Sequence, residues 1–208
     1  MRPSVNAARS GDRSPAASAD AMCGRKRRQQ RQETSYASCG KVVTLMTRDS
    51  VRVAAIDLDN PSHAQSLIEM LDHYARDPMG GGKGLTPDAR ERLVPELRRF
   101  PGYAGALAYV GDEPVGLINC FIGFSTFAAR PLLNIHDIVV RRERRGHGIA
   151  HTLLDWAQHS AASLQCCKLT LEVLSNNERA LRIYERAGFK PYMLDPAAGQ
   201  AVLLQKIL

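Results

Sequence analysis

The chain has 208 residues, and 44% of them are apolar, which suffices for the core of one domain of ordinary size. Its five cysteines show no CxxC spacing, which argues against a disulfide framework and a zinc site and favours a reducing, cytoplasmic location. No segment reaches the about 18 uninterrupted apolar residues of a membrane span, so we do not expect a membrane protein. We also expect no metal site.

The net charge of +7 is concentrated at the start of the chain. Residues 1–45 carry nine Lys and Arg against three Asp and Glu, whereas residues 46–208 carry nineteen against eighteen. We therefore predict a disordered basic tail over residues 1–45 and one domain over residues 46–208. The tail could bind nucleic acid weakly, or it could precede a natural start at Met46. The nearly neutral domain makes nucleic acid an unlikely main partner.

A strand and two helices are predicted at the start of the domain. Residues 51–56 alternate and are rich in β-branched side chains, as in a strand. The first helix is expected to run from a cap at Ser62 to about Ala75. Thr86 is expected to cap the second helix, and Pro95 to kink or split it.

A glycine-rich segment, Asp77 to Gly84, separates these helices. Four of the five residues from Gly80 to Gly84 are glycine, so a flexible loop is expected rather than a helix. Such a segment can be a simple connector or a mobile lid over a substrate, and the sequence favours neither.

The rest of the domain predicts a mixed, largely antiparallel sheet flanked by helices. A tight turn at residues 111–114 indicates a hairpin. The expected elements are strands at 105–110, 115–124 and 131–140, a helix to about 162, a strand at 168–174, a helix at 177–187 closed by Gly188, and a final hairpin of 189–194 and 201–207.

The segment from Ile135 to Leu154 combines a strand, a basic loop and a helix. Gly146 and Gly148 remove side chains at the turn, and several backbone N–H groups of the helix start point the same way. This arrangement predicts an anion site, here for the pyrophosphate of a coenzyme. It is neither a Walker A loop nor a complete G-x-G-x-x-G fingerprint, because His151 occupies the third glycine position.

Segments before, within and after this loop resemble motifs of one protein family. Arg145 to Ala150, RGHGIA, is similar to the R-G-x-G-x-G/A signature of the GNAT superfamily of acetyl-CoA-dependent N-acetyltransferases. Ile138 to Val140 resembles its splayed fourth strand, and Asn177 to Phe189 resembles its N-x-x-A-x-x-x-Y-x-x-x-G-F segment. The resemblance covers about residues 50–208. It implies an α/β (α+β) fold, with a mixed, mostly antiparallel six- to seven-stranded sheet, a splayed fourth strand and about four helices.

The resemblance also implies an enzyme that moves an acetyl group from acetyl-CoA to a primary amine by direct transfer in a ternary complex. The loop amides would hold the pyrophosphate, the splayed strand and Asn177 would contact the amide-bearing arm of the coenzyme, and Tyr184 would protonate the departing thiolate. The coenzyme-binding residues so implied are Ile138, Val139, Val140, Arg145, Gly146, His147, Gly148, Ile149, Ala150 and Asn177.

The acceptor amine must be neutral to attack, which calls for a base. His136 is the first candidate, because it takes the place where many relatives carry glutamate and histidine titrates near about 6.5. Asp137 and Glu172 are alternatives, and a histidine packed in the sheet is a further possibility. Adjacent strand residues face opposite sides, so His136 and Asp137 should not both face the site unless a bulge intervenes.

Contacts to the acceptor are expected from Asp77, Phe124, Asp137 and Glu172, although core packing is an equal expectation for Phe124. The acceptor itself, a small-molecule or peptide amine, is not identified by the sequence. Two other functions stay open: a non-catalytic acetyl-CoA-binding module or sensor on the same fold, and a nucleic-acid-associated protein acting through its tail. A homodimer is an expectation from the family alone.

Overall fold

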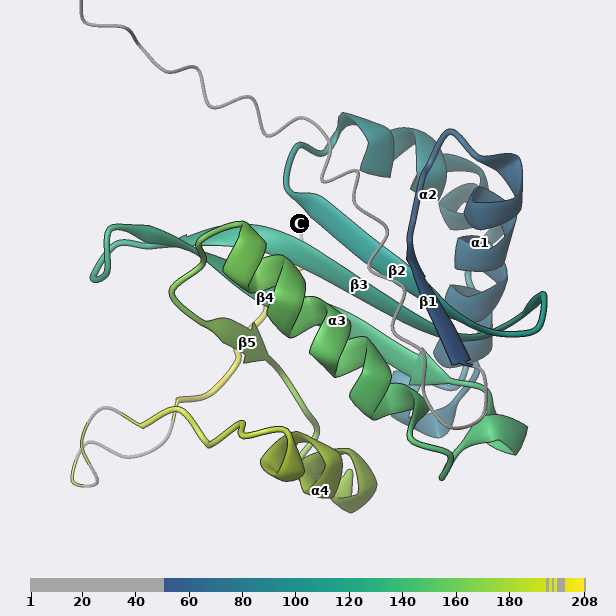
Figure 1. Cartoon of the computed structure of the whole chain (residues 1–208). Helices are drawn as coiled ribbons and strands as arrows, with labels where there is room; N and C mark the ends of the chain where they lie inside the picture. Colours follow the sequence, from purple (N-terminus) through teal and green to yellow (C-terminus); the bar gives the residue numbers. More distant parts are fainter. Residues whose placement is uncertain (1–50, 194, 196, 198–200, 208) are drawn as a thin grey trace, which may run out of the picture. The chain divides into compact units, whose positions relative to one another are not determined.

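The computed structural model describes residues 51–193, 195, 197 and 201–207 (Figure 1). The predicted tail at 1–45 and the proposed start at Met46 lie outside these residues. In the part described, five strands form one sheet in the order β1-β2-β3-β4-β5, accompanied by four α-helices. No helix in this part is long and apolar enough to cross a membrane.

The elements follow one another closely along the chain. They are β1 (Val51–Ala55), α1 (Pro61–Ala75), the 3-10 turn η1 (Pro78–Gly80), α2 (Pro87–Arg99), β2 (Tyr103–Val110), β3 (Glu113–Ser125), β4 (Arg130–Val140), the 3-10 turn η2 (Arg142–Arg144), α3 (Ile149–Ser163), β5 (Leu169–Leu171) and α4 (Glu178–Arg186).

The sheet is antiparallel from β1 to β4 and parallel between β4 and β5. Helices α1 and α2 connect β1 to the antiparallel strand β2, and short connections reverse the chain from β2 to β3 and from β3 to β4. Helix α3 instead carries the chain back before β5, so β5 runs in the same direction as β4. The predicted mixed, mostly antiparallel fold is confirmed, with one strand fewer than the lower predicted number.

Helices cover both faces of the sheet because its side chains alternate (Figure 1). Ile118 of β3 packs in one cluster with Leu153 of α3. Its neighbour Leu117 packs in a second cluster with Leu67 of α1 and Val94 of α2. These two clusters form the core, and they leave the carboxyl end of β4 between α1 and α3.

The starts of α1 and α2 test the predicted caps. Asn60, not Ser62, caps α1: its side chain accepts a hydrogen bond from the Ser62 N–H, and Pro61 begins the helix. Thr86 caps α2 as predicted. Of the kink or split predicted at Pro95, the split is wrong, since α2 continues through this residue. Pro95 is exposed, so water can reach the carbonyl that its ring leaves without a donor.

Asp72 of α1 links the chain just after the glycine-rich segment to both α1 and α2. Its carboxylate accepts a hydrogen bond of 2.9 Å from Arg76 Nε and one of 2.8 Å from the Leu85 N–H, and it pairs with Arg90. Burial raises the pKa of Asp72, but these hydrogen bonds and the Arg76 charge outweigh burial and hold the pKa below its ordinary value.

Asp72→Asn is expected to lower the free energy of unfolding by about 2 kcal/mol near neutral pH, because it removes a largely buried charge partner of two arginines. A carboxylate with a lowered pKa stabilises the fold above about pH 4, and this contribution is lost as the pH falls through the folded-state pKa. Urea unfolding at about pH 7 and about pH 3 should therefore show a difference from wild type that shrinks in acid. An equal difference at both values would contradict this account, and Asp155→Asn on the exposed face of α3 is the matched control.

The predicted final hairpin is wrong in the residues described. Residues 189–193 and 201–207 form no strand, and the residues between them are only partly described. Pro191 lacks a backbone N–H for a ladder, and Tyr192 and Leu204 are exposed rather than packed on the sheet. The sheet therefore ends at β5 in this part of the chain.

Candidate active site

The loop between β4 and α3 presents unpaired backbone amides. Gly146 and Gly148 have φ angles of +89° and +81°, which glycine adopts without strain. Gly148 is the N-cap of α3, and no side chain caps this helix start. The first N–H groups of α3 are therefore available to an anion.

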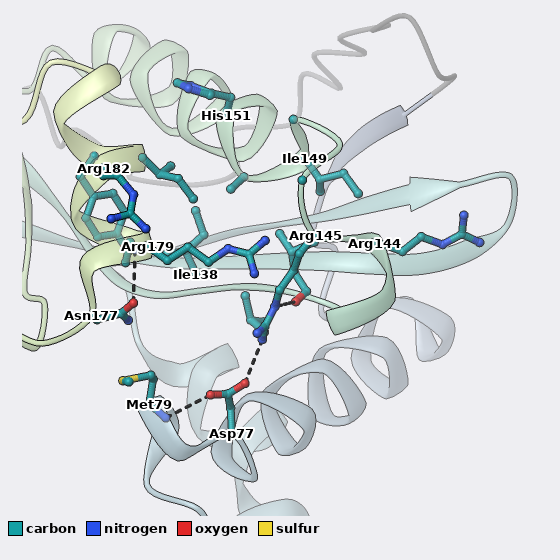
Figure 2. Close-up of a pocket in the computed structure, with 18 of the residues that line it drawn as sticks. Asp77, Met79, Ile138, Arg144, Arg145, Ile149, His151, Asn177, Arg179 and Arg182 are labelled. Carbon is teal, nitrogen blue, oxygen red and sulfur yellow. Dashed lines mark hydrogen bonds and ion pairs between the residues drawn. The ribbon is translucent and has the colours of Figure 1, made fainter.

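Arg145 orders this loop rather than reaching out of it (Figure 2). Its Nε donates to the Val140 carbonyl at 3.0 Å, and its Nη2 donates to Asp77 Oδ2 at 2.9 Å. Arg142 lies 3.4 Å from the same carboxylate oxygen. Burial raises the pKa of Asp77, but the Arg145 hydrogen bond, the Met79 N–H and the charges of both arginines hold it below its ordinary value.

The second half of β4 has a strand on one side only. β3 pairs with β4 as far as Val140, whereas β5 pairs with it only from Leu133 to Ile135. Past Leu171 the chain leaves β4 and leads to α4 (Figure 1). In the part of the chain described here, no further strand pairs with this side of β4 from Ile138 to Val140, as the predicted splayed strand requires.

A cavity of about 440 Å³ lies between this edge, the loop, α4 and the end of α1. All predicted coenzyme-binding residues except His147 line it; His147 is exposed. Tyr184 lines the same cavity. Residues of the motif at Arg145 to Ala150 and of the motif at Asn177 to Phe189, which are separate in the sequence, therefore line the same cavity.

Asn177 and Tyr184 hold defined positions on α4. Asn177 is its N-cap, and its side-chain oxygen accepts a hydrogen bond of 3.2 Å from the Ala180 N–H. The Tyr184 ring packs edge-on against Phe189. Burial, with a smaller contribution from Tyr74, raises the pKa of Tyr184 to about 12, so its hydroxyl keeps its proton at neutral pH.

Sequence reasoning missed three arginines in this cavity. Arg179, Arg182 and Arg186 line it from α4. Their spacing of three and four residues places them on one helix face, which is a signal that the sequence does contain. Figure 2 shows Arg179 extending into the cavity beside Ile138. These side chains place positive charge along the α4 side of the cavity, although Arg182 also pairs with Glu178.

A β-bulge lies next to the splayed edge of β4. Asn119 of β3 pairs with Asp137, and the next β3 residue, Cys120, pairs with Ile135, so His136 is the extra residue on β4. The bulge breaks the alternation, and both His136 and Asp137 face one second cavity of about 360 Å³. From the sequence, His136 and Asp137 were expected to face the same site only if a bulge lay between them, and this bulge is present.

A polar network holds Asp137 inside this second cavity. Asn119 Nδ2 donates to Asp137 Oδ2 at 3.1 Å, and the Tyr103 hydroxyl donates to Asn119 Oδ1 at 3.0 Å. His136 Nδ1 lies 3.5 Å from the other oxygen, Asp137 Oδ1. The Asp137 side chain is 18% exposed and that of His136 is 64% exposed, so His136 is no packed core residue. Burial, with the charge of Asp137, raises the pKa of Cys120 to about 12, so this thiol stays protonated.

Tyr74 joins the two cavities, since it lines both of them. Burial raises its pKa, as do the charges of Asp137 from one side and Asp77 from the other. Gly80 permits this packing, because a Cβ there would lie 2.0 Å from the Tyr74 carbonyl oxygen. Tyr74 was missed because its helical spacing from Leu67 and Leu71 is that of a core residue.

The predicted acceptor residues do not all come together. Asp137 lies in the second cavity, whereas Asp77 lines the first one. Phe124 is 63% exposed, so it is not in the core, and it lines neither cavity. Glu172 is exposed just after β5 and also lies outside both linings. Phe121, from the same aromatic stretch, lines the second cavity instead.

Comparison with known proteins decides the family. The model of the acetyltransferase (GNAT) family matches residues 66–189, more than half of the chain. The chain belongs to the GNAT acetyltransferase family. This acetyltransferase is 26% identical over 130 residues to the thialysine N-epsilon-acetyltransferase of Caenorhabditis elegans. The aligned residues cover 62% of this chain and 78% of that protein. The chain is an acyltransferase enzyme, as the resemblance implied.

Solved structures share the fold of this acetyltransferase. A crystal structure of a probable acetyltransferase aligns over 75% of this chain and 98% of its own, with a TM-score of 0.64 and 22% identity. AAC(6')-Iy in complex with the bisubstrate analogue CoA-S-monomethyl-acetylneamine aligns over 76% of this chain and 99% of its own, with a TM-score of 0.60 and 15% identity. These likenesses establish the fold class.

Proposed function

We propose that this acetyltransferase moves an acetyl group from acetyl-CoA to a primary amine by direct transfer in a ternary complex. One observation carries the proposal: the cavity at the glycine loop and the cavity that contains His136 and Asp137 share Tyr74 in their linings. A thioester held in the first cavity and an amine held in the second would reach each other at this junction. Direct transfer needs this simultaneous access and no covalent enzyme intermediate.

The first cavity fits the chemistry of coenzyme A. The glycine loop and the uncapped start of α3 offer backbone N–H groups to a pyrophosphate, and the arginines of α4 add positive charge. The backbone edge at Ile138 to Val140 can pair with the amide groups of the coenzyme arm, as an added strand would. A backbone N–H of this edge can also polarise the thioester carbonyl.

The reaction then needs one proton acceptor and one proton donor. The amine nitrogen attacks the thioester carbon, so a C–N bond forms and the C–S bond breaks. His136 takes the proton that the amine loses, and Tyr184 gives its hydroxyl proton to the departing sulfur. The carboxylate beside His136 Nδ1 favours a proton on that nitrogen, which leaves Nε2 as the basic atom.

Asp77→Asn is expected to raise KM for acetyl-CoA about tenfold with little change in kcat. It removes the charged partner of Arg145 and thereby loosens the loop, a loss comparable to one charge-assisted hydrogen bond of about 1.5 kcal/mol. Steady-state kinetics with acetyl-CoA as the varied substrate measure this change. Asp155→Asn serves as the matched control, and an unchanged KM in Asp77→Asn would show that the ion pair does not organise the binding loop.

A panel of primary amines assayed for thiol release with acetyl-CoA tests the proposed function, with calorimetry to measure acetyl-CoA binding separately. We expect both binding and amine-dependent thiol release. Binding without thiol release from any amine would instead support a non-catalytic acetyl-CoA-binding module. Absence of binding would contradict the assignment of the first cavity.

A further inference from the structure

Most side chains that line the second cavity are apolar, whereas His136 and Asp137 lie together on β4. Its walls are half-buried apolar side chains from α1, the following loop, α2 and β3. These are Leu71, Ala75, Leu85, Leu93, Leu97 and Phe121. Within the described lining, Asp137 is the only carboxylate, and it lies beside His136 on β4.

Phe121, which lines this cavity, belongs to an aromatic cluster. The Phe121 ring meets the His136 ring edge-on with centroids 5.5 Å apart, and it meets Phe100 in the same way at 5.3 Å. Tyr103 lies 5.8 Å from Phe121 at a tilted angle. A flat apolar group that enters the cavity would therefore find an aromatic surface next to the proposed base.

The charge pattern suits one ammonium group and disfavours a second. Asp137 can attract the ammonium form of an amine, and its nitrogen then lies beside His136, which can take its proton. A second ammonium group or several hydroxyls would lie against leucine side chains without partners. Each such unpaired polar group costs about 1–3 kcal/mol, whereas an apolar body gains about 25 cal/mol for each Å² removed from water.

We propose that the acceptor is a monoamine with an apolar body, either an alkylamine or an arylalkylamine, rather than a polyamine or an amino sugar. This inference rests on the proposed function and names the substrate class of the same site. It assigns recognition of the ammonium group to Asp137 and recognition of the apolar body to Phe121 and the leucines of α1 and α2.

Hexylamine and 1,6-diaminohexane test the proposal directly, because they differ only in the second amino group. With acetyl-CoA saturating, we expect kcat/KM for thiol release to be at least about tenfold higher with hexylamine, in line with one unpaired polar group. 2-Phenylethylamine should match or exceed hexylamine. Equal or better turnover of the diamine, or turnover confined to a peptide amine, would overturn the substrate class while leaving the acetyltransferase function intact. If acetyl-CoA binds and no amine releases thiol, both proposals fail.

Two variants locate the preference in this cavity. Phe121→Leu should reduce kcat/KM for 2-phenylethylamine several-fold more than for hexylamine, while Phe127→Leu, a fully exposed residue outside both cavities, should change neither. Leu97→Glu adds a second carboxylate to the wall and should narrow or reverse the difference between hexylamine and the diamine. Unaltered selectivity in a folded Phe121→Leu and a folded Leu97→Glu would place the acceptor elsewhere.

Discussion

Tyr184→Phe is expected to lower kcat by about a hundredfold or more while KM for acetyl-CoA changes little. The hydroxyl is the proposed proton donor to the coenzyme sulfur, and loss of a positioned general acid typically costs about 10² to 10⁴ in rate. Phenylalanine keeps the ring that packs against Phe189, so the fold should persist. Steady-state kinetics of thiol release measure the change, and circular dichroism checks the fold.

The pH dependence of the wild-type enzyme provides an independent test of this role. A donor is active only while it holds its proton, and the pKa of Tyr184 is raised to about 12. Its hydroxyl is therefore protonated through the neutral and mildly alkaline range, and Tyr184 should cause no fall in kcat there. Tyr192→Phe, which changes an exposed tyrosine, is the matched control and should retain full activity. A Tyr184→Phe enzyme with normal kcat would remove this residue from the mechanism.

His136→Ala is expected to reduce kcat/KM about a hundredfold near neutral pH and to change the shape of its pH profile. A general base contributes to the pH profile of kcat/KM, so removal of the proposed base should change the shape of that profile. The remaining activity of the variant should depend on the ionisation of the amine alone.

The matched control for His136→Ala is His159→Ala, which removes an exposed histidine of α3. The pH profile carries more information than the rate, because a purely structural loss would lower activity without changing the profile. An unchanged profile in His136→Ala would exclude His136 as the base. Asp137, which lies in the same cavity, would then be the next candidate.

The sequence was sufficient where a local pattern has one structural solution. The loop between β4 and α3 was predicted from the segment Arg145 to Ala150, which follows a β-branched run and precedes an apolar helix face. Glycines at positive φ and the start of a helix constrain the backbone over these few residues. Thr86 was predicted as a cap for the same reason. Alternation placed β1 to β4 within a few residues of their observed bounds.

The tertiary structure decided the features that depend on partners distant in the chain. The bulge at His136 follows from the register between β3 and β4, which side-chain alternation alone does not reveal. Arg145 meets Asp77 across 68 residues, so the glycine-rich segment is tied to the loop and Asp77 lies away from Asp137. Likewise, Phe121 rather than Phe124 reaches the second cavity, because the end of the β3–β4 hairpin extends beyond the helices.

The sequence by itself therefore indicated the family, the fold class and the course of the glycine loop, since these follow from contiguous motifs. Only the tertiary structure decided which side chains share the cavity next to His136. That cavity is built from α1, α2, β3 and β4, and its apolar lining arises from half-buried leucines that a helical pattern assigns to the core. The physical reason is that packing between elements, rather than any local preference, determines which side chains remain partly uncovered and face the same space.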